Sequence, residues 1–161
     1  MDATNSSSKT IENLISRLKH DYPTYIFQEG AQEHWSPKDK TIFFNSSHPC
    51  FGVLHELAHA VLKHSTYQTD FELLKLESEA WELAAKIGQK YNIKIDEDHI
   101  QNCLDTYRDW LHRRSACPAC GTHVLQKSSK NYYCYNCETV WSVSSGRFVR
   151  PYRKTLKTKT A

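Results

Sequence analysis

Two histidines and a glutamate stand within one helical turn of each other in the stretch HELAHAVLKH, residues 55–64. His55 and His59 are four residues apart, so on an α-helix their imidazoles lie on one face and can bind a single zinc ion. Glu56, next to the first ligand, can act as a base toward a zinc-bound water without being a ligand itself. The pattern predicts a catalytic zinc site with Glu56 as the general base.

The residues around this motif favour a buried helix, because they are small or apolar: Leu57, Ala58, Ala60, Val61 and Leu62. The alternative is that the histidines are ordinary polar residues at the edge of a core, where their burial without a partner would be costly. His64 lies five residues after His59 and is rotated by about 140° on an ideal helix. We therefore expect His64 at the surface or in the last turn, and not as a ligand.

A catalytic zinc needs a third protein ligand and one position left open for water. The stretch LESEAWELAA offers Glu77, Glu79 and Glu82 on the next expected helix. Measured around the helix from Ala80, Glu77 lies about 60° to one side and Glu79 about 100° to the other. Helix geometry alone leaves both as candidates.

HELAH followed by EAWELAAKI resembles the ImmA/IrrE-type metallopeptidases, whose helix after HExxH reads roughly E-A-x-x-F-A-A. The resemblance implies that His55 and His59 are zinc ligands, Glu56 the general base and Glu79 the third ligand. Helix geometry keeps Glu77 as the alternative. The spacing from His59 to Glu79 is also similar to that of thermolysin-like gluzincins. Leu83 stands where the family has Phe, so the likeness is confined to short motifs within residues 40–90.

The same resemblance implies an intracellular zinc metallo-endopeptidase, whose protein substrate is a DNA-binding regulator by analogy alone. In that chemistry Glu56 takes a proton from water as the peptide carbonyl is attacked. Tyr67 is a candidate donor to the oxyanion. The strand TIFFN, residues 41–45, is expected to be a sheet edge that pairs with an extended peptide.

Four cysteines form a second group, spaced C-x₂-C-x₁₃-C-x₂-C: Cys117, Cys120, Cys134 and Cys137. Two such pairs supply four thiolates to a closed tetrahedral site, so we expect a zinc ribbon with a structural zinc. About 35 residues cannot bury a sufficient core without such a metal. The expected cofactors are therefore two Zn²⁺ ions, one catalytic and one structural.

The cysteine-rich end is basic: residues 115–161 carry eight Lys/Arg and one acid, whereas residues 1–114 carry thirteen Lys/Arg and seventeen acids. Basic and aromatic side chains together suit nucleic acid, through phosphate contacts and base stacking; they are Lys127, Lys130, Arg147, Arg150, Arg153, Lys154, Tyr132, Tyr133, Trp141 and Phe148. The alternative is a staple or protein-docking module whose aromatic residues form its own small core.

Two other functions stay open. Trp81, four residues after Glu77, resembles the H-x-x-x-W/F helix of SprT-like proteases, which act on DNA-associated proteins and use a histidine where this chain has Glu77. The third possibility is a non-catalytic DNA-binding or adaptor protein with a relic HExxH site. The complete His, Glu, His set argues against that.

The elements that must position these groups follow from apolar periodicity. Helices are expected over residues 11–22, from about residue 49 through the histidines, over 70–91 and from residue 96. Short strands are expected over 25–28, 33–36 and 41–45, the last two joined by a turn at PKDK. The sequence thus predicts an α+β fold: a small zincin-like metallopeptidase domain with a short antiparallel sheet, followed by a zinc ribbon.

The expected domain organisation is a disordered lead-in (1–10), a metallopeptidase domain (11–114), the zinc ribbon (115–150) and a basic flexible tail (151–161). No apolar run reaches the roughly 20 residues that cross a bilayer, and the start lacks the layout of a secretory signal. We therefore expect a cytoplasmic protein whose thiols stay reduced and whose partner is a protein or peptide substrate, without a membrane.

Overall fold

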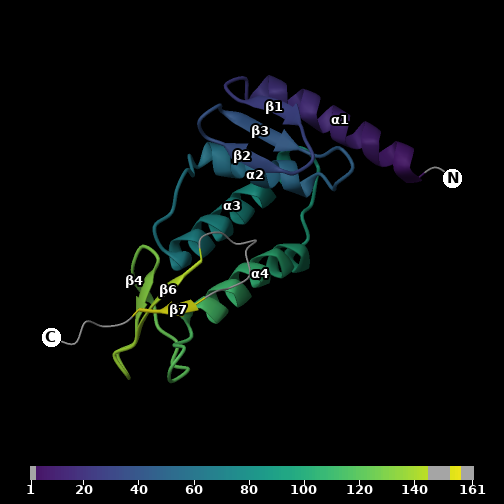
Figure 1. Cartoon of the computed structure of the whole chain (residues 1–161). Coiled ribbons are helices and arrows are strands. Elements are labelled where there is room, and N and C mark those ends of the chain that lie inside the picture. Colours follow the sequence, from purple (N-terminus) through teal and green to yellow (C-terminus); the bar gives the residue numbers. More distant parts are fainter. Residues whose placement is uncertain (1–2, 145–152, 157–161) are drawn as a thin grey trace. The chain divides into compact units, whose positions relative to one another are not determined.

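The computed structural model describes residues 3–144 and 153–156 (Figure 1), and among these the fold is α+β, with four helices and two small sheets. The chain divides into two compact units, one of Met1–Ser65 with Ser78–Glu97 and the other of Thr66–Glu77 with Asp98–Ala161. The division falls inside helix α3 (Asp70–Lys90), which itself is continuous. The domain boundaries expected from the sequence stay a prediction.

Helix α1 (Ala3–Asp21) opens the first unit, and its expected apolar stripe is buried: Ile11, Leu14, Ile15 and Leu18. The helix begins at Ala3, so residues 3–10 are helical where a disordered lead-in was expected. Extending a helix that is already nucleated adds one hydrogen bond for each residue fixed, so polar residues such as these can continue it.

The first sheet has the strand order β1-β3-β2, from β1 (Ile26–Glu29), β2 (His34–Ser36) and β3 (Thr41–Phe44). β2 and β3 form the expected antiparallel hairpin, but β1 pairs with β3 in parallel. The expectation of an antiparallel sheet is therefore wrong for one of the two pairings. The expectation that TIFFN is a sheet edge is also wrong. Three of the four side chains of β3 are buried, which suits a strand with neighbours on both sides.

Helix α2 (Phe51–Val61) carries the histidine motif and packs against β3 and β2, whereas α1 packs against β1 (Figure 1). Two hydrogen bonds attach the carboxyl end of α2 to the sheet region. The Tyr25 hydroxyl donates to the carbonyl of Ala60 at 3.1 Å, and the Trp35 indole N–H donates to the carbonyl of His64 at 2.9 Å. The end of the motif helix is thus fixed from two sides.

The second unit holds helix α4 (Glu97–Ser115) and an antiparallel sheet of order β4-β5-β6-β7. Its strands are β4 (Gln126–Ser128), β5 (Asn131–Tyr133), β6 (Val140–Val143) and β7 (Arg153–Thr155). Residues 153–155 therefore form a strand where a flexible tail was expected, because β6 offers backbone groups that another strand can pair with. Residues 157–161 lie outside the described part.

The second unit is packed around Tyr132 and Trp141, whose rings are stacked with centroids 5.2 Å apart and planes 7° apart. Next to them the buried Arg114 donates two hydrogen bonds to Asp70, at 2.7 and 3.1 Å, and the Tyr132 hydroxyl donates to the same carboxylate at 2.5 Å. Asp70 is the first residue of α3, so this network fixes the start of that helix within the second unit.

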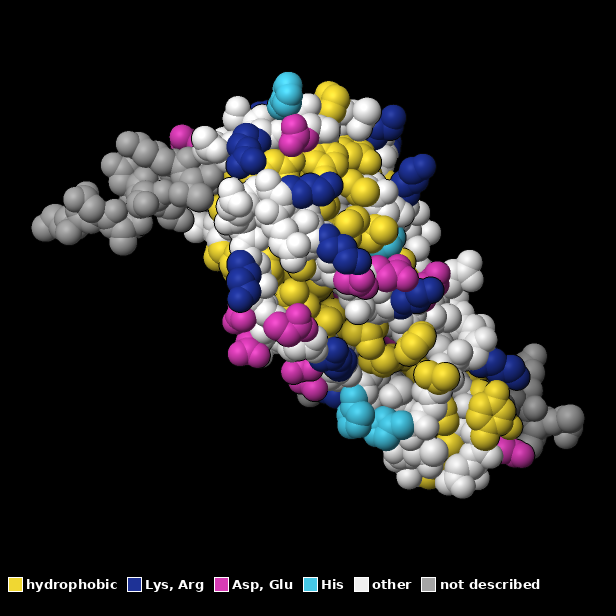
Figure 2. All heavy atoms as spheres, turned by 180° about the vertical axis from the view of Figure 1, so that it is seen from behind, with side chains coloured by type: hydrophobic (Ala, Val, Ile, Leu, Met, Phe, Trp, Pro, Cys, Tyr) yellow, Lys and Arg dark blue, Asp and Glu magenta, His cyan; other side chains and the backbone are white. Residues whose placement is uncertain are grey.

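The charges and apolar groups of the surface are mixed on the face shown in Figure 2, where Lys and Arg side chains are interspersed with Asp and Glu, and hydrophobic side chains lie between them. No helix among the described residues combines the length and the low polarity that a bilayer crossing needs.

Candidate metal centres

The first candidate metal centre begins with the histidine pair on α2. His55 is buried and His59 half-buried, and their Nε2 atoms lie 3.1 Å apart. The helix turns these residues to one face because they are four positions apart. Trp81 of α3 stacks on the His55 ring, with centroids 4.1 Å apart and planes at 28°, which limits the rotation of that imidazole.

Glu77 of α3 completes this group, since one ligand atom from each of His55, His59 and Glu77 lies within 4.8 Å of the others. Glu77 is 7% exposed, and it precedes Ala80 and Trp81 by three and four residues. Residues at these spacings share a helix face, so Glu77 points with Ala80 and Trp81 toward the buried side of α3.

Glu79, the third ligand implied by the family resemblance, is not in this group, whereas Glu77, the alternative, is. Two positions along a helix rotate a side chain by about 200°, which takes Glu79 away from the face of Glu77. The Glu79 side chain is 43% exposed, and one of its carboxylate oxygens lies 3.6 Å from Nε2 of His64.

His64 lies in the turn that closes α2, one of the two places expected for it, and not at the surface, since its side chain is 10% exposed. α2 ends at Val61, and Lys63 adopts a left-handed conformation with φ 59°. The N–H of His64 donates to the carbonyl of His59 at 3.0 Å and that of Lys63 to Ala60 at 3.1 Å, which is the Schellman pattern of a helix end. This turn returns the His64 ring to His59, with their Nδ1 atoms 2.9 Å apart.

The donor atoms of the first centre fit zinc. Two nitrogens that each lie 2.0–2.1 Å from a tetrahedral zinc are roughly 3.3 Å apart. The 3.1 Å between the two Nε2 atoms is close to this value. Two imidazoles and one carboxylate are also a ligand set of catalytic zinc sites, where a fourth position stays open. Glu56, on the same turn of α2, is half-buried.

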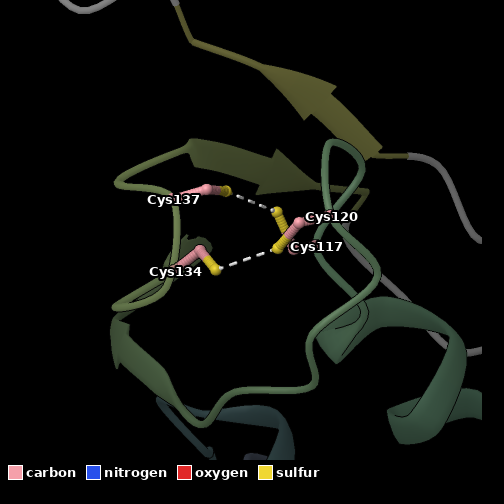
Figure 3. Close-up of side chains that lie close together, drawn as sticks. All are labelled: Cys117, Cys120, Cys134 and Cys137. Carbon is pink, nitrogen blue, oxygen red and sulfur yellow. Dashed lines mark hydrogen bonds between the residues drawn. The ribbon is translucent and has the colours of Figure 1, made fainter.

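The second candidate metal centre consists of the four cysteines, whose sulfur atoms face one another (Figure 3). Sγ of Cys117 lies 3.6 Å from that of Cys137, and Sγ of Cys120 lies 3.5 Å from that of Cys134. These distances exceed a disulfide bond and approach the roughly 3.8 Å between two ligands of a tetrahedral zinc at 2.3 Å. The spacing of the cysteines in the sequence therefore predicted a group that the fold brings together.

The thiols of this centre differ in acidity. Hydrogen bonds from the Thr122 hydroxyl and the Thr122 backbone N–H lower the pKa of Cys120 to about 5, whereas burial raises the pKa of Cys134 to about 11. Only thiolates are metal ligands, so a cation bound here has to displace the proton of Cys134.

Three residues of the cysteine turns were missed in the sequence. Thr122 and Thr139 lie two positions after Cys120 and Cys137, and their hydroxyl oxygens lie 3.3 and 3.2 Å from those sulfurs. Glu138 has φ 59°, the left-handed conformation that Gly121 has in the first turn with φ 76°. The sequence does contain a signal for these residues, because CPACGT and CYNCET repeat one pattern. In each, a pair of cysteines is followed by a left-handed residue and then by a threonine.

The aromatic residues expected to stack on nucleic-acid bases are divided by the fold. Tyr132 and Trp141 are 1% and 0% exposed, so they form the core of the module, as the alternative interpretation had it. Tyr133 is half-buried with the Lys127 ammonium 5.2 Å from its ring centre. Arg147, Phe148 and Arg150 lie outside the described residues.

Comparison of the chain with protein-family models, with curated proteins and with solved structures found no match.

Proposed function

We propose that this chain is a zinc-dependent metallo-endopeptidase, in which His55, His59 and Glu77 hold the catalytic zinc and Glu56 is the general base. The observation that carries the proposal is the convergence of the three ligand atoms within 4.8 Å, next to the glutamate of an HExxH motif. A chance cluster of histidines would not need a carboxylate from a second helix, nor a base beside the first ligand.

The zinc, when bound, supplies Lewis acidity: it lowers the pKa of a bound water toward about 7 and polarises the peptide carbonyl. Two neutral imidazoles and one carboxylate leave the centre with a formal charge of +1, which preserves that acidity. Glu56 accepts a proton from the attacking water and delivers it to the amine nitrogen as the carbon–nitrogen bond breaks. The products are a carboxylate and an amine, and no further reactant is required.

An extended peptide substrate needs a strand to pair with, and β2 is the edge strand that packs against α2. This replaces β3, which has neighbours on both sides, as the peptide-binding strand. Tyr67 remains the candidate donor to the oxyanion. It is 40% exposed, and burial and then the charge of Asp70 raise its pKa, so its hydroxyl keeps its proton at neutral pH.

We also propose that the histidine centre lies in a zincin-like domain and that the four cysteines hold a structural zinc in a zinc ribbon. Four thiolates leave no open position for a substrate. The ImmA/IrrE resemblance supports the same zinc chemistry through His55, Glu56 and His59. We further propose that the protein is cytoplasmic and that its substrate is a DNA-binding regulator, the substrate class that this resemblance implies.

A second candidate, an SprT-like protease that acts on DNA-associated proteins, is favoured by the position of Glu77. The third ligand of those proteins occupies this position in their sequence pattern, and the aromatic residue four positions later is here Trp81, stacked on His55. Stimulation of cleavage by DNA, falling steeply with salt, would distinguish this candidate from the first.

Glu56→Gln tests the proposed chemistry, because the amide keeps the shape of the side chain but cannot accept the proton. We expect two zinc ions per chain in the wild type and in this variant, with cleavage of a peptide library lost by a factor of at least about 100 in the variant. Zinc is measured by elemental analysis and cleavage by mass spectrometry of the products.

Glu77→Gln and Glu79→Gln are the matched pair for the ligand. We expect the first to bind one zinc per chain and the second to bind two. Equal cleavage by wild type and Glu56→Gln, or a wild type that binds a single zinc, contradicts the proposal.

A further inference from the structure

The ring of His59 has two nitrogen atoms with different surroundings. Nε2 faces Nε2 of His55 at 3.1 Å, and Nδ1 faces Nδ1 of His64 at 2.9 Å. A neutral imidazole that offers its Nε2 lone pair to a metal carries its proton on Nδ1. The proton of His59 therefore points to His64.

The backbone of His64 is held by two hydrogen bonds and by the conformation of the residue before it. Its N–H donates to the His59 carbonyl at 3.0 Å, its carbonyl accepts from the Trp35 indole at 2.9 Å, and Lys63 holds the left-handed turn before it. A non-glycine residue in this conformation is uncommon and persists where the surrounding contacts require it. The turn thus presents one particular nitrogen of His64 to His59.

Glu79 lies at the far side of the His64 ring, with a carboxylate oxygen 3.6 Å from Nε2. If Nδ1 of His64 accepts the proton of His59, the proton of His64 is on Nε2, toward this carboxylate. The three side chains then form a directional series, from His59 to His64 to Glu79, in which each ring nitrogen has one role.

We propose that His64 is a positioning residue for the metal ligand His59, and that Glu79 in turn orients His64. The hydrogen bond selects the tautomer of His59 with a free Nε2 lone pair and holds the ring in its metal-binding orientation. Partners of this kind raise the affinity of a site for its metal, and their loss typically costs 10–100-fold. The inference rests on the proposed function, since it concerns the same zinc, and it gives Glu79 a role other than ligand.

The test is the zinc affinity of the full chain, measured by equilibration with increasing concentrations of a competing chelator and elemental analysis of the protein. The four-cysteine centre of the same chain serves as the internal reference, because its ligand atoms are the sulfurs of Cys117, Cys120, Cys134 and Cys137 and include no histidine. We expect His64→Ala to bind zinc at the histidine centre about 10–100-fold more weakly than the wild type, with the cysteine centre unchanged.

A second variant separates positioning from simple loss of packing. His64→Asn keeps an acceptor oxygen near the place of Nδ1 and should restore most of the affinity, whereas His64→Leu fills the space without an acceptor and should not. Glu79→Gln should lower the affinity by a few-fold. Its matched control on the same helix is Glu82→Gln, and the control for the histidine is His20→Ala. Both are exposed and should leave the affinity unchanged.

The outcomes distinguish the two proposals. A wild type with two zinc ions and a His64→Ala variant of unchanged affinity overturn the inference alone. Equal affinities of His64→Asn and His64→Leu also overturn it, because the acceptor would then be irrelevant. A wild type with zinc at the cysteines only overturns the proposed function.

Discussion

Glu138 occupies, in the second cysteine turn, the left-handed position that Gly121 occupies in the first. The N–H of Glu138 donates to the carbonyl of Cys134 at 2.8 Å, as that of Gly121 donates to Cys117 at 2.9 Å, so the two turns share one backbone shape. The two turns carry the four cysteines, whose sulfur atoms all lie within 4.8 Å of one another. A side chain at a left-handed position clashes with the following carbonyl and costs roughly 1–2 kcal/mol.

Glu138→Gly is therefore expected to stabilise the zinc-loaded chain by about 1 kcal/mol, whereas Gly121→Ala is expected to destabilise it by a similar amount. Nothing lies within 4 Å of an added Cβ at Gly121, so the second effect comes from the backbone alone. The free energies of unfolding are compared by denaturant titration at saturating zinc. A Glu138→Gly variant less stable than the wild type would show that the carboxylate, and not the backbone, matters at this position.

At the scale of the elements, α2 and α3 both end in a Schellman motif. The N–H of Ile93 donates to the carbonyl of Gly88 and that of Asn92 to Gln89, at 2.9 and 3.2 Å, with Asn92 left-handed at φ 59°. The end of α2 has the same two hydrogen bonds, and Lys63 is its left-handed residue, as Asn92 is at the end of α3. At α3 the returning chain passes so close that a Cβ on Gly88 would lie 2.7 Å from the carbonyl oxygen of Ile93.

Gly88→Ala is thus expected to destabilise the chain by about 1–3 kcal/mol, although alanine is the better helix former, because backbone has to move to admit the methyl group. The neighbouring Gln89→Ala is the control, since Gln89 is exposed on the same turn. Thermal unfolding of both variants checks the difference. An unchanged or raised Tm for Gly88→Ala would mean that the backbone of the turn after α3 can move to admit the methyl group at little cost in stability.

At the scale of the whole molecule, the two candidate metal centres lie beside cores of different size. The cysteine centre lies in a module whose buried core is small: Cys117, Tyr132, Cys134, Trp141 and Val143. Two of these five residues are themselves candidate ligands, so a metal held by the cysteines would be part of that core. The histidine centre is flanked by the larger core of α1, α2 and the first sheet, which needs no metal to be buried.

Loss of the cysteine-bound metal should therefore unfold the module and spare the first unit. In Cys134→Ser we expect one zinc per chain, loss of amide-hydrogen protection over residues 117–143, and retained protection in α1 and α2. Hydrogen exchange read by mass spectrometry measures this. His59→Ala is the matched variant, expected to lose the other zinc and keep protection throughout. Full protection of residues 117–143 in metal-free Cys134→Ser would show that the module folds on its own packing.

What the sequence by itself determined are the features that depend on spacing along one element. The stripe of α1, the one-turn separation of His55 and His59 and the paired cysteines follow from the 3.6-residue period and from short turns, which are local properties. Apart from the hairpin of β2 and β3, which the sequence predicted, tertiary structure alone decided which elements meet. It grouped Glu77 and not Glu79 with the histidines, put β3 in the centre of its sheet, paired residues 153–155 with β6 and turned His64 back to His59. Each of these depends on packing between different segments of the chain or on the residue at which a helix ends. The periodicity of residues along a single element determines neither.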